Sequence, residues 1–177
     1  MPNWVRTRIT FPDVTDEQFC SIVCAYCGYK GGNGQPTLDF EKILPIPDDV
    51  LRGDLSFDEI INHTSGKENW YDWCIKNWGT KWNAFRGTVD PDCHALYFET
   101  AWDYPYPVIN KLASQLGTTI VAVSLDEDVS RGVTITTHYT TRCAMPRVVV
   151  ATVAYDSPGF WDYVQELWGM TKEDYLE

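Results

Sequence analysis

The first residues of the chain alternate between apolar and polar side chains, which is the pattern of a half-buried β-strand. The segment 4–11 places four residues on the face that would turn toward a core: Val5, Thr7, Ile9 and Phe11. The opposite face carries two arginines, Arg6 and Arg8. We therefore expect a strand over this segment, with one face packed against the rest of the protein.

A helix is predicted directly after this strand. Thr15 and Gln18 have the spacing of a capping box, in which the threonine side chain and the glutamine side chain each bond the other residue's backbone N–H. The residues that follow form one apolar stripe at helical spacing: Phe19, Ile22, Val23 and Tyr26. Gly28 is expected to end the helix.

The second half of the chain predicts further strands and two helices. Alternating or continuous apolar patterns indicate strands over 84–90, 95–102, 118–125, 133–140 and 147–155. Strand 118–125 is apolar on both faces and should lie inside its sheet. Apolar residues at helical spacing predict helices over 108–116 and 160–168, the first ending at Gly117.

Outside residues 29–80, the predicted order is strand, helix, strand, strand, helix, strand. This is the ferredoxin-like (βαββαβ) arrangement of an α+β fold with a mainly antiparallel sheet. We expect one domain over 1–177, with 29–80 as an insertion and 146–177 as an appended strand and helix. Within the insertion, 38–47 should be extended because of Pro45 and Pro47, and a helix should cover 57–63.

The segment 69–85 is the densest aromatic part of the chain, with tryptophans at 70, 73, 78 and 82. Helical spacing predicts a helix that stops at Gly79. A buried tryptophan removes about 150–250 Å² from water, so a packing centre is the favoured interpretation. The alternative is an exposed aromatic platform or pocket for bases, sugars or another small ligand, lined by Trp70, Trp78 or Trp82.

Charge restricts the choice of partners. The 177 residues carry a formal net charge of −11 and the sequence pI is about 4.6. Because nucleic-acid binding depends on lysine and arginine displacing counterions, direct binding to nucleic acid is not expected. The charge favours a protein partner with a basic surface. The acidic residues expected to contact it are Asp126, Glu127 and Asp128, followed by Asp48, Asp49, Asp58 and Glu59.

The sequence also indicates where the protein acts. No apolar run approaches the roughly 18 residues of a membrane span, and the first ten residues resemble a strand and not a signal peptide. We therefore expect a cytoplasmic protein that does not bind membranes, with its cysteines reduced.

Cys20, Cys24 and Cys27 have a C-x3-C-x2-C spacing. It resembles the motif with which radical S-adenosylmethionine enzymes hold a [4Fe–4S] cluster. That motif needs a loop, whereas these cysteines fall within the capped helix, so we favour small apolar residues beside a core and expect no metal or cofactor. The other cysteines and the histidines have no zinc-site spacing, and no residue is singled out as catalytic.

Four segments together resemble the YubB-like family of plasmid and phage accessory proteins. They are M-P-N-W at 1–4, F-E-K-I-L-P-I-P at 40–47, the tryptophan block 71–83, and F-E-T-A-W at 98–102. The resemblance covers about residues 1–140 and implies a ferredoxin-like domain without an assigned activity. Val5 stands where many relatives carry cysteine, and 146–177 has no counterpart in the family.

The resemblance implies that the protein is carried on a bacterial mobile element. Together with the charge, it favours a non-enzymatic accessory protein that inhibits a host defence complex, for example a CRISPR-type nuclease, through its acidic surface or by imitating nucleic acid. A module that binds a nucleotide or another small ligand through an aromatic pocket is the alternative. An iron–sulfur enzyme that uses the three cysteines is the least favoured hypothesis. The oligomeric state is left open.

Overall fold

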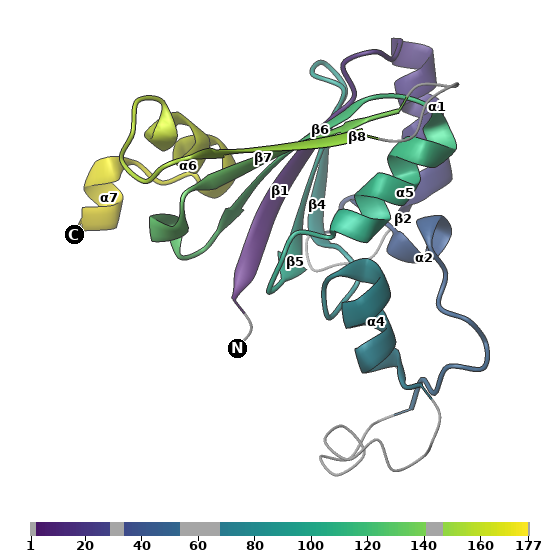
Figure 1. Cartoon of the computed structure of the whole chain (residues 1–177). Coiled ribbons are helices and arrows are strands. Elements are labelled where there is room, and N and C mark those ends of the chain that lie inside the picture. The colour runs from purple at the N-terminus through teal and green to yellow at the C-terminus, as the bar shows by residue number, and fades with distance from the viewer. Residues whose placement is uncertain (1–2, 29–33, 54–67, 141–146, 177) are drawn as a thin grey trace.

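The computed structural model describes residues 3–28, 34–53, 68–140 and 147–176. Within these residues, helices pack on both faces of a six-stranded sheet (Figure 1). The strands of this sheet are β1 (Trp4–Thr10), β4 (Phe85–Asp90), β5 (Ala95–Ala101), β6 (Ile120–Asp126), β7 (Val133–Tyr139) and β8 (Arg147–Val153). The helices are α1 (Asp16–Tyr26), α2 (Phe40–Ile43), α4 (Trp70–Trp78), α5 (Tyr106–Leu116), α6 (Phe160–Trp168) and α7 (Lys172–Leu176). Short β2 (Cys27–Gly28) and β3 (Thr37–Leu38) form a separate pair.

Strand β1 lies inside the sheet, whose order is β4–β5–β1–β6–β7–β8. Neighbouring strands run antiparallel, and Val5 pairs with Thr100 of β5 on one side and with Asp126 of β6 on the other. The expected α+β class with a mainly antiparallel sheet is confirmed. Strand β6 lies between β1 and β7, which agrees with the apolar residues on both of its faces.

One face of the sheet supports the larger of two hydrophobic cores. Ile9 of β1 and Phe98 of β5 are buried there together with Phe19 of α1 and Leu112 of α5. The β1 side chains alternate as predicted, because Val5, Thr7 and Ile9 are buried while the intervening residues are half-buried. Burying an aliphatic or aromatic side chain contributes about 1.5–3 kcal/mol, so this shared core holds α1 and α5 against the sheet.

The expected capping signals are present at the helix ends, except at the end of α1. The prediction that Gly28 ends this helix was wrong, because α1 ends at Tyr26, Cys27 turns the backbone into an extended conformation, and Gly28 belongs to β2. Both bonds of the capping box between Thr15 and Gln18 are present at the start of α1. Helices α4 and α5 end at Gly79 and Gly117, which have φ of 79° and 64°, the left-handed conformation that glycine adopts without strain. In the described part of the chain, no helix has the length and apolar character needed to cross a bilayer.

The second core lies on the other face of the sheet, under α6. Phe160, Val164 and Leu167 of α6 are buried against Val123 and Leu125 of β6. The predicted C-terminal strand and helix are therefore present as β8 and α6, and α6 packs directly on the sheet. Helix α7, which the sequence analysis did not predict, follows α6 after Gly169.

The expectation of extended chain over 38–47 was wrong for part of that segment, because α2 occupies Phe40–Ile43. The Asp39 side chain caps this helix by accepting from the backbone N–H of Glu41, and the Asn83 side chain accepts from the N–H of Phe40. Both prolines lie beyond the last helical residue, so they do not interrupt it. The helix expected over 57–63 lies outside the described residues.

A buried histidine joins β7 to α5. The Tyr104 hydroxyl lies 2.8 Å from Nε2 of His138, and Nδ1 lies 3.4 Å from Oδ1 of Asn110. Burial lowers the pKa of His138 from 6.5 to about 4, so the ring is neutral at pH 7. A neutral ring with its proton on Nδ1 accepts from Tyr104 and donates to Asn110.

We expect this histidine to make the protein less stable as the pH falls below 6.5. The unfolded state takes up the proton near pH 6.5 and the folded state only near pH 4. The resulting loss in unfolding free energy is about 2 kcal/mol at pH 5. Urea denaturation at pH 7 and pH 5 measures it, and His138→Gln should remove most of the difference. An equal pH dependence in both proteins would contradict this prediction.

Candidate functional site

The acidic segment 126–128 has one buried side chain and two exposed ones. Asp126 is buried, where its carboxylate accepts from the backbone N–H of Asp128 at 2.8 Å and lies 3.5 Å from the guanidinium of Arg131. Asp128 is exposed and caps the short η1 turn (Val129–Arg131), and hydrogen bonds from Ser130 lower its pKa. Glu127 is exposed. Of these three predicted contact residues, only Glu127 and Asp128 present their side chains to solvent.

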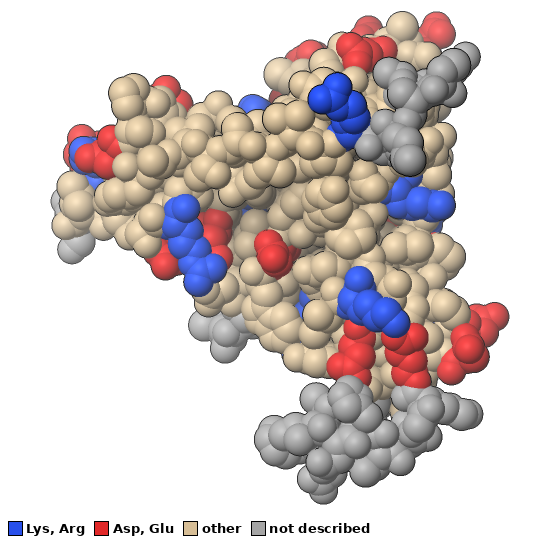
Figure 2. All heavy atoms as spheres, in the orientation of Figure 1, with Lys and Arg blue, Asp and Glu red and all other residues tan. Residues whose placement is uncertain are grey.

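The second predicted acidic group lies partly within the described chain. Asp48 and Asp49 are exposed and line an open cavity with Arg52 and Glu68. Asp58 and Glu59 lie outside the described residues. Figure 2 shows charged side chains of both signs scattered over a mostly uncharged face. On that face, the net charge of −11 is not gathered into one continuous acidic patch.

The tryptophans of the segment 69–85 are divided between core and surface. Trp78 is 3% exposed, and its indole N–H donates to the carbonyl of Leu44 at 2.8 Å. Trp73 is also buried, with its ring centre 5.8 Å from that of Trp78. Trp70 is half-buried and Trp82 is 38% exposed. The expected burial is confirmed for Trp73 and Trp78 and was wrong for Trp82.

The ammonium group of Lys81 lies among three aromatic rings at the surface. Its Nζ is 4.5 Å from the ring centre of Trp82, 5.3 Å from that of Trp102 and 5.5 Å from that of Tyr71. A cation within about 6 Å of a ring centre is attracted to the negative face of the ring. We call these four residues the Lys81 aromatic cluster. Because Trp82 and Trp102 are 38% and 40% exposed, the cluster is open to a partner.

Neighbouring rings enlarge this aromatic surface. The ring of Trp4 lies 6.2 Å from Trp82 and stacks on Phe85 at 5.7 Å. The rings of Trp70 and Tyr71 also pack edge to face, with their centres 6.0 Å apart. Trp4 was predicted as part of the strand 4–11 and not as a site residue. Its contribution depends on the pairing of β1 with β5, which no local sequence pattern shows.

Trp102 enters the cluster through an unusual backbone conformation. Its φ is 76°, in the left-handed region that bulky residues rarely adopt. The backbone N–H of Trp102 donates to the carbonyl of Asn3 at 2.8 Å, just beyond the end of β5. Such a conformation costs about 1–3 kcal/mol and is often found at functional sites. Trp102 was not predicted as a site residue, because the sequence pattern placed it at the end of the strand 95–102.

One pair of predicted acidic residues lies beside the cluster, next to Trp70. The backbone N–H of Trp70 donates to Leu51 and its indole N–H donates to Gly53, at 2.9 and 3.2 Å. These bonds attach the loop that carries Asp48 and Asp49 to the first turn of α4. Asp48 and Asp49 therefore belong to a loop that contacts Trp70, whose ring packs on Tyr71 of the cluster.

The other acidic segment lies on the side of Trp102. Trp102 and Tyr104 line a cavity of about 200 Å³ together with Asp126 and Arg131. The exposed residues Glu127 and Asp128 follow Asp126 directly in the chain. The structure thus brings the aromatic and acidic features that were predicted separately to adjacent parts of one surface.

The three N-terminal cysteines do not share one environment. Cys20 and Cys24 are exposed on α1, whereas Cys27 is buried after the end of the helix. Burial raises the pKa of the Cys27 thiol to about 11, which keeps it protonated at neutral pH. Among the described residues, no group of three or more His, Cys, Asp or Glu side chains is arranged to hold a metal ion.

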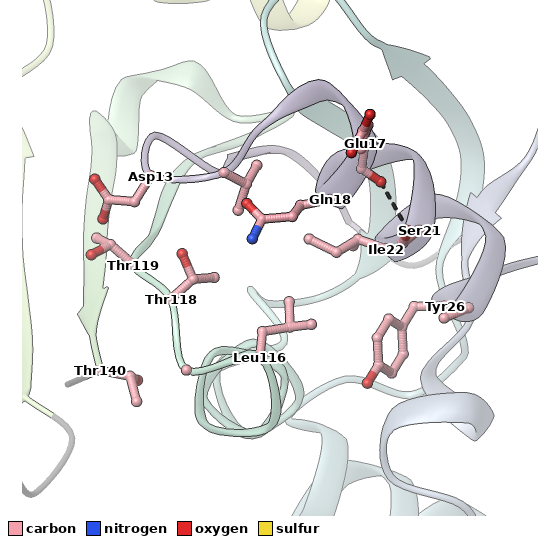
Figure 3. Close-up of a pocket in the computed structure, with 13 residues that line it drawn as sticks. Asp13, Glu17, Gln18, Ser21, Ile22, Tyr26, Leu116, Thr118, Thr119 and Thr140 are labelled. Carbon is pink, nitrogen blue, oxygen red and sulfur yellow. Dashed lines mark hydrogen bonds between the residues drawn. The ribbon is translucent and has the colours of Figure 1, made fainter. Parts of the chain in front are cut away.

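A groove between α1 and the C-terminal end of α5 encloses about 710 Å³ (Figure 3). Ile22, Tyr26 and Leu116 provide apolar surface, and Gln18 and Thr118 present polar groups. The described residues that line it also include Asp13 and Glu17, but neither a lysine nor an arginine. A cavity of this size can hold a small organic molecule, so the groove is a second candidate site.

We expect the two tryptophans of the 69–85 segment to differ in their effect on stability. Trp78→Ala should lower the unfolding free energy by about 3–5 kcal/mol, because it empties a buried site and leaves the Leu44 carbonyl without its donor. Trp82→Ala should lower it by about 1 kcal/mol, because much of the ring is already in water. Denaturant titration measures both, and equal losses would show that Trp82 is a core residue.

Comparison with known proteins adds no assignment to this geometry. The chain matches no protein-family model, no curated protein sequence and no solved structure. Functional inference therefore depends on the Lys81 aromatic cluster, the acidic residues beside it and the groove along α1.

Proposed function

We propose that this protein is a non-enzymatic binding protein that docks on another protein through the Lys81 aromatic cluster. The observation that carries the proposal is the exposure of Trp82 and Trp102 on one surface, next to further aromatic rings. Tryptophan, tyrosine and arginine dominate the binding energy of protein interfaces. Covering these half-exposed rings would stabilise a complex by removing apolar surface from water.

Contacts among the four side chains of the Lys81 aromatic cluster hold them in place before a partner binds. Lys81 contacts three rings at once, and the rings of Tyr71 and Trp102 pack edge to face, with centres 6.0 Å apart and 80° between the planes. The strained backbone of Trp102 is fixed by its bond to Asn3. Rings that are already held in place lose less conformational entropy when a partner covers them. This supports a docking role for Trp102 beyond packing within the chain.

The acidic residues beside the cluster favour a partner with a basic surface. Asp48 and Asp49 are in the loop that bonds to Trp70, and Glu127 donates its backbone N–H to the carbonyl of Trp4, with Asp128 next in the chain. All four side chains are exposed. Opposite charges at the rim of an interface mainly accelerate encounter. In combination with the family resemblance, the partner class is a positively charged host protein, such as a nucleic-acid-binding component of a defence complex.

The ferredoxin-like assignment belongs to the same proposal. The elements β1, α1, β4, β5, α5 and β6 follow one another in the chain as βαββαβ, with other segments between α1 and β4. Their strand order β4–β5–β1–β6 supports the assignment, because the first strand lies between the third and the fourth. Residues 29–80 then form the insertion that carries α4, and 146–177 the extension that carries β8 and α6.

A small-ligand-binding module is the second candidate. The groove of Figure 3 supports it, since its volume is about 710 Å³ and its lining combines apolar side chains with hydroxyl and carboxylate groups. The acidic lining favours a neutral or positively charged ligand. The aromatic pocket expected from the sequence is not the basis of this candidate, because Trp78 is buried in the core.

We expect the aromatic cluster to be necessary for partner binding. Proteins captured from a bacterial lysate by the wild-type chain should be lost with the double variant Trp82→Ala, Trp102→Ala. Two interface residues that each contribute about 2 kcal/mol correspond to an affinity change of roughly 100-fold or more. Affinity for the recovered protein is then measured by biolayer interferometry.

The matched control for this test is Tyr175→Ala. Tyr175 is a similarly exposed aromatic residue on α7, which Figure 1 places across the molecule from α4. It should bind like the wild type. Circular dichroism verifies that each variant is folded. If the double variant retains the captured proteins, the cluster is not the docking surface, and the groove along α1 becomes the leading site.

We also expect the acidic residues to govern the rate of association. Reversing Asp48 and Asp49, or Glu127 and Asp128, to lysine should slow binding of the recovered partner several-fold at about 50 mM salt. The difference should shrink at about 300 mM salt, because screening shortens the reach of the charges. Glu173→Lys on α7 is the control. If the reversed variants associate at the wild-type rate, the acidic residues only keep the surface solvated.

A further inference from the structure

Strand β8 is an exposed apolar edge of the sheet. Among the described residues it pairs with β7 alone, and its sequence is R-V-V-V-A-T-V. Val149 is 50% exposed and Val150 is 60% exposed, and these neighbours point to opposite faces of the sheet. Neither face of the middle of this strand is therefore covered by the described part of the chain.

The opposite edge of the sheet is protected. Strand β4 has a register shift between Phe85 and Thr88, and Arg86 within it has a φ of 46°. Its Gly87 lies against β3 and donates a backbone hydrogen bond to the Thr37 hydroxyl at 2.8 Å. A side chain at Gly87 would collide with the Thr37 backbone, since an added Cβ would lie 2.5 Å from Thr37 Cα. Bulges and covering segments are common devices that prevent pairing at an edge.

Strand β8 has none of these devices within its described residues. Its register with β7 is continuous from Val133–Val153 to Tyr139–Arg147, without a bulge. It contains no proline, no glycine and, between its ends, no charged residue. Alternate residues of such an edge direct their N–H and C=O groups away from the sheet. These groups and the valines form a template for one more strand.

We propose that β8 pairs with β8 of a second copy of this chain, antiparallel and centred on Val150, to join two sheets into one. A twofold axis perpendicular to the sheet at Val150 keeps the faces of the two sheets aligned. Val149 then lies opposite Ala151, and Val148 opposite Thr152. Cross-strand pairs of β-branched residues stabilise a sheet. The strand is self-complementary in this register, which favours a second copy over an unrelated partner.

Charge determines the antiparallel direction. Arg147 is the one charged residue of β8 and stands at its N-terminal end. The C-terminal end leads into the segment 154–177, which has six acidic residues and one lysine. Two of these carboxylates pair with cations of the same chain, Asp156 with Lys172 and Glu166 with Arg8, so the segment keeps a net negative charge that is smaller than the count of acidic residues. Antiparallel pairing brings Arg147 of each copy toward the acidic segment of the other. Parallel pairing would place the two arginines side by side and the two acidic segments side by side, where like charges repel.

The proposed dimer leaves the Lys81 aromatic cluster free. Lys81 precedes β4 in the chain and Trp102 directly follows β5. These two strands lie at the edge of the sheet that is opposite to β8. The dimer would therefore carry two docking surfaces, one at each outer end of the joined sheet. A target with repeated sites would bind it more tightly than it binds a monomer, because the second contact is intramolecular.

Sedimentation velocity over a range of protein concentrations tests the proposal. One strand pair is smaller than a standard interface, so we expect a dimer with a dissociation constant of about 1–100 µM. Val150→Lys places two like charges across the twofold axis and should raise this constant by about tenfold or more. Ile75→Lys is the control, because Ile75 is an exposed apolar residue on α4, away from β8, and this variant should dimerise like the wild type.

A crosslink tests the register. Val150→Cys brings two thiols together at the twofold axis, and oxidation should give a covalent dimer that peptide mapping locates at position 150 in both copies. This readout remains decisive if Val150→Lys proves unfolded by circular dichroism. A wild-type chain that stays monomeric at about 200 µM, roughly twice the upper end of that range, would overturn the proposal, because most of the chain should then be dimeric. So would a dimer that persists in folded Val150→Lys without a crosslink at position 150.

Discussion

Strand β1 packs against helices on both faces of the sheet, and these contacts position the other elements. Ile9 packs under the helices of the larger core, and Val5 is buried on the same face of the strand. On the other face, the guanidinium of Arg6 donates to the Leu167 carbonyl at 2.6 Å, near the end of α6, and lies 3.4 Å from the buried carboxylate of Glu99. The guanidinium of Arg86 lies 3.5 Å from the other oxygen of this carboxylate. A buried carboxylate without a cationic partner would destabilise the fold by several kcal/mol, so Arg6 fixes α6 and, together with Arg86, allows Glu99 to be buried.

Local signals in the sequence predicted the elements whose stability is local. The capping box at Thr15, the helix ends at Gly79 and Gly117, and the alternation along β1 all gave correct elements, because each depends on residues within about one or two turns. Helix α2 was missed because one of its first N–H groups is satisfied by Asn83, far along the chain. Short segments of this kind are decided by tertiary contacts, which sequence periodicity does not report.

The candidate site was predicted in part. The density of tryptophans directed attention to the correct segment, but the pattern could not separate Trp78, which faces the core, from Trp82, which faces solvent. Lys81 and Trp102 meet only because α4, the turn before β4 and the end of β5 converge. Asp126 was expected at the surface from its polar neighbours, yet its position at the end of an interior strand buries it.

The central position of β1 also affects the order in which the protein can fold. This strand is synthesised before the strands it pairs with, since Val5 pairs with Thr100 and Asp126, which come much later in the sequence. Contacts between distant parts of a chain form slowly, because a long loop must close before they stabilise anything. The two edges of β1 therefore stay without their partner strands until β5 and β6 have been synthesised, and synthesis of β6 determines when the sheet can close around β1.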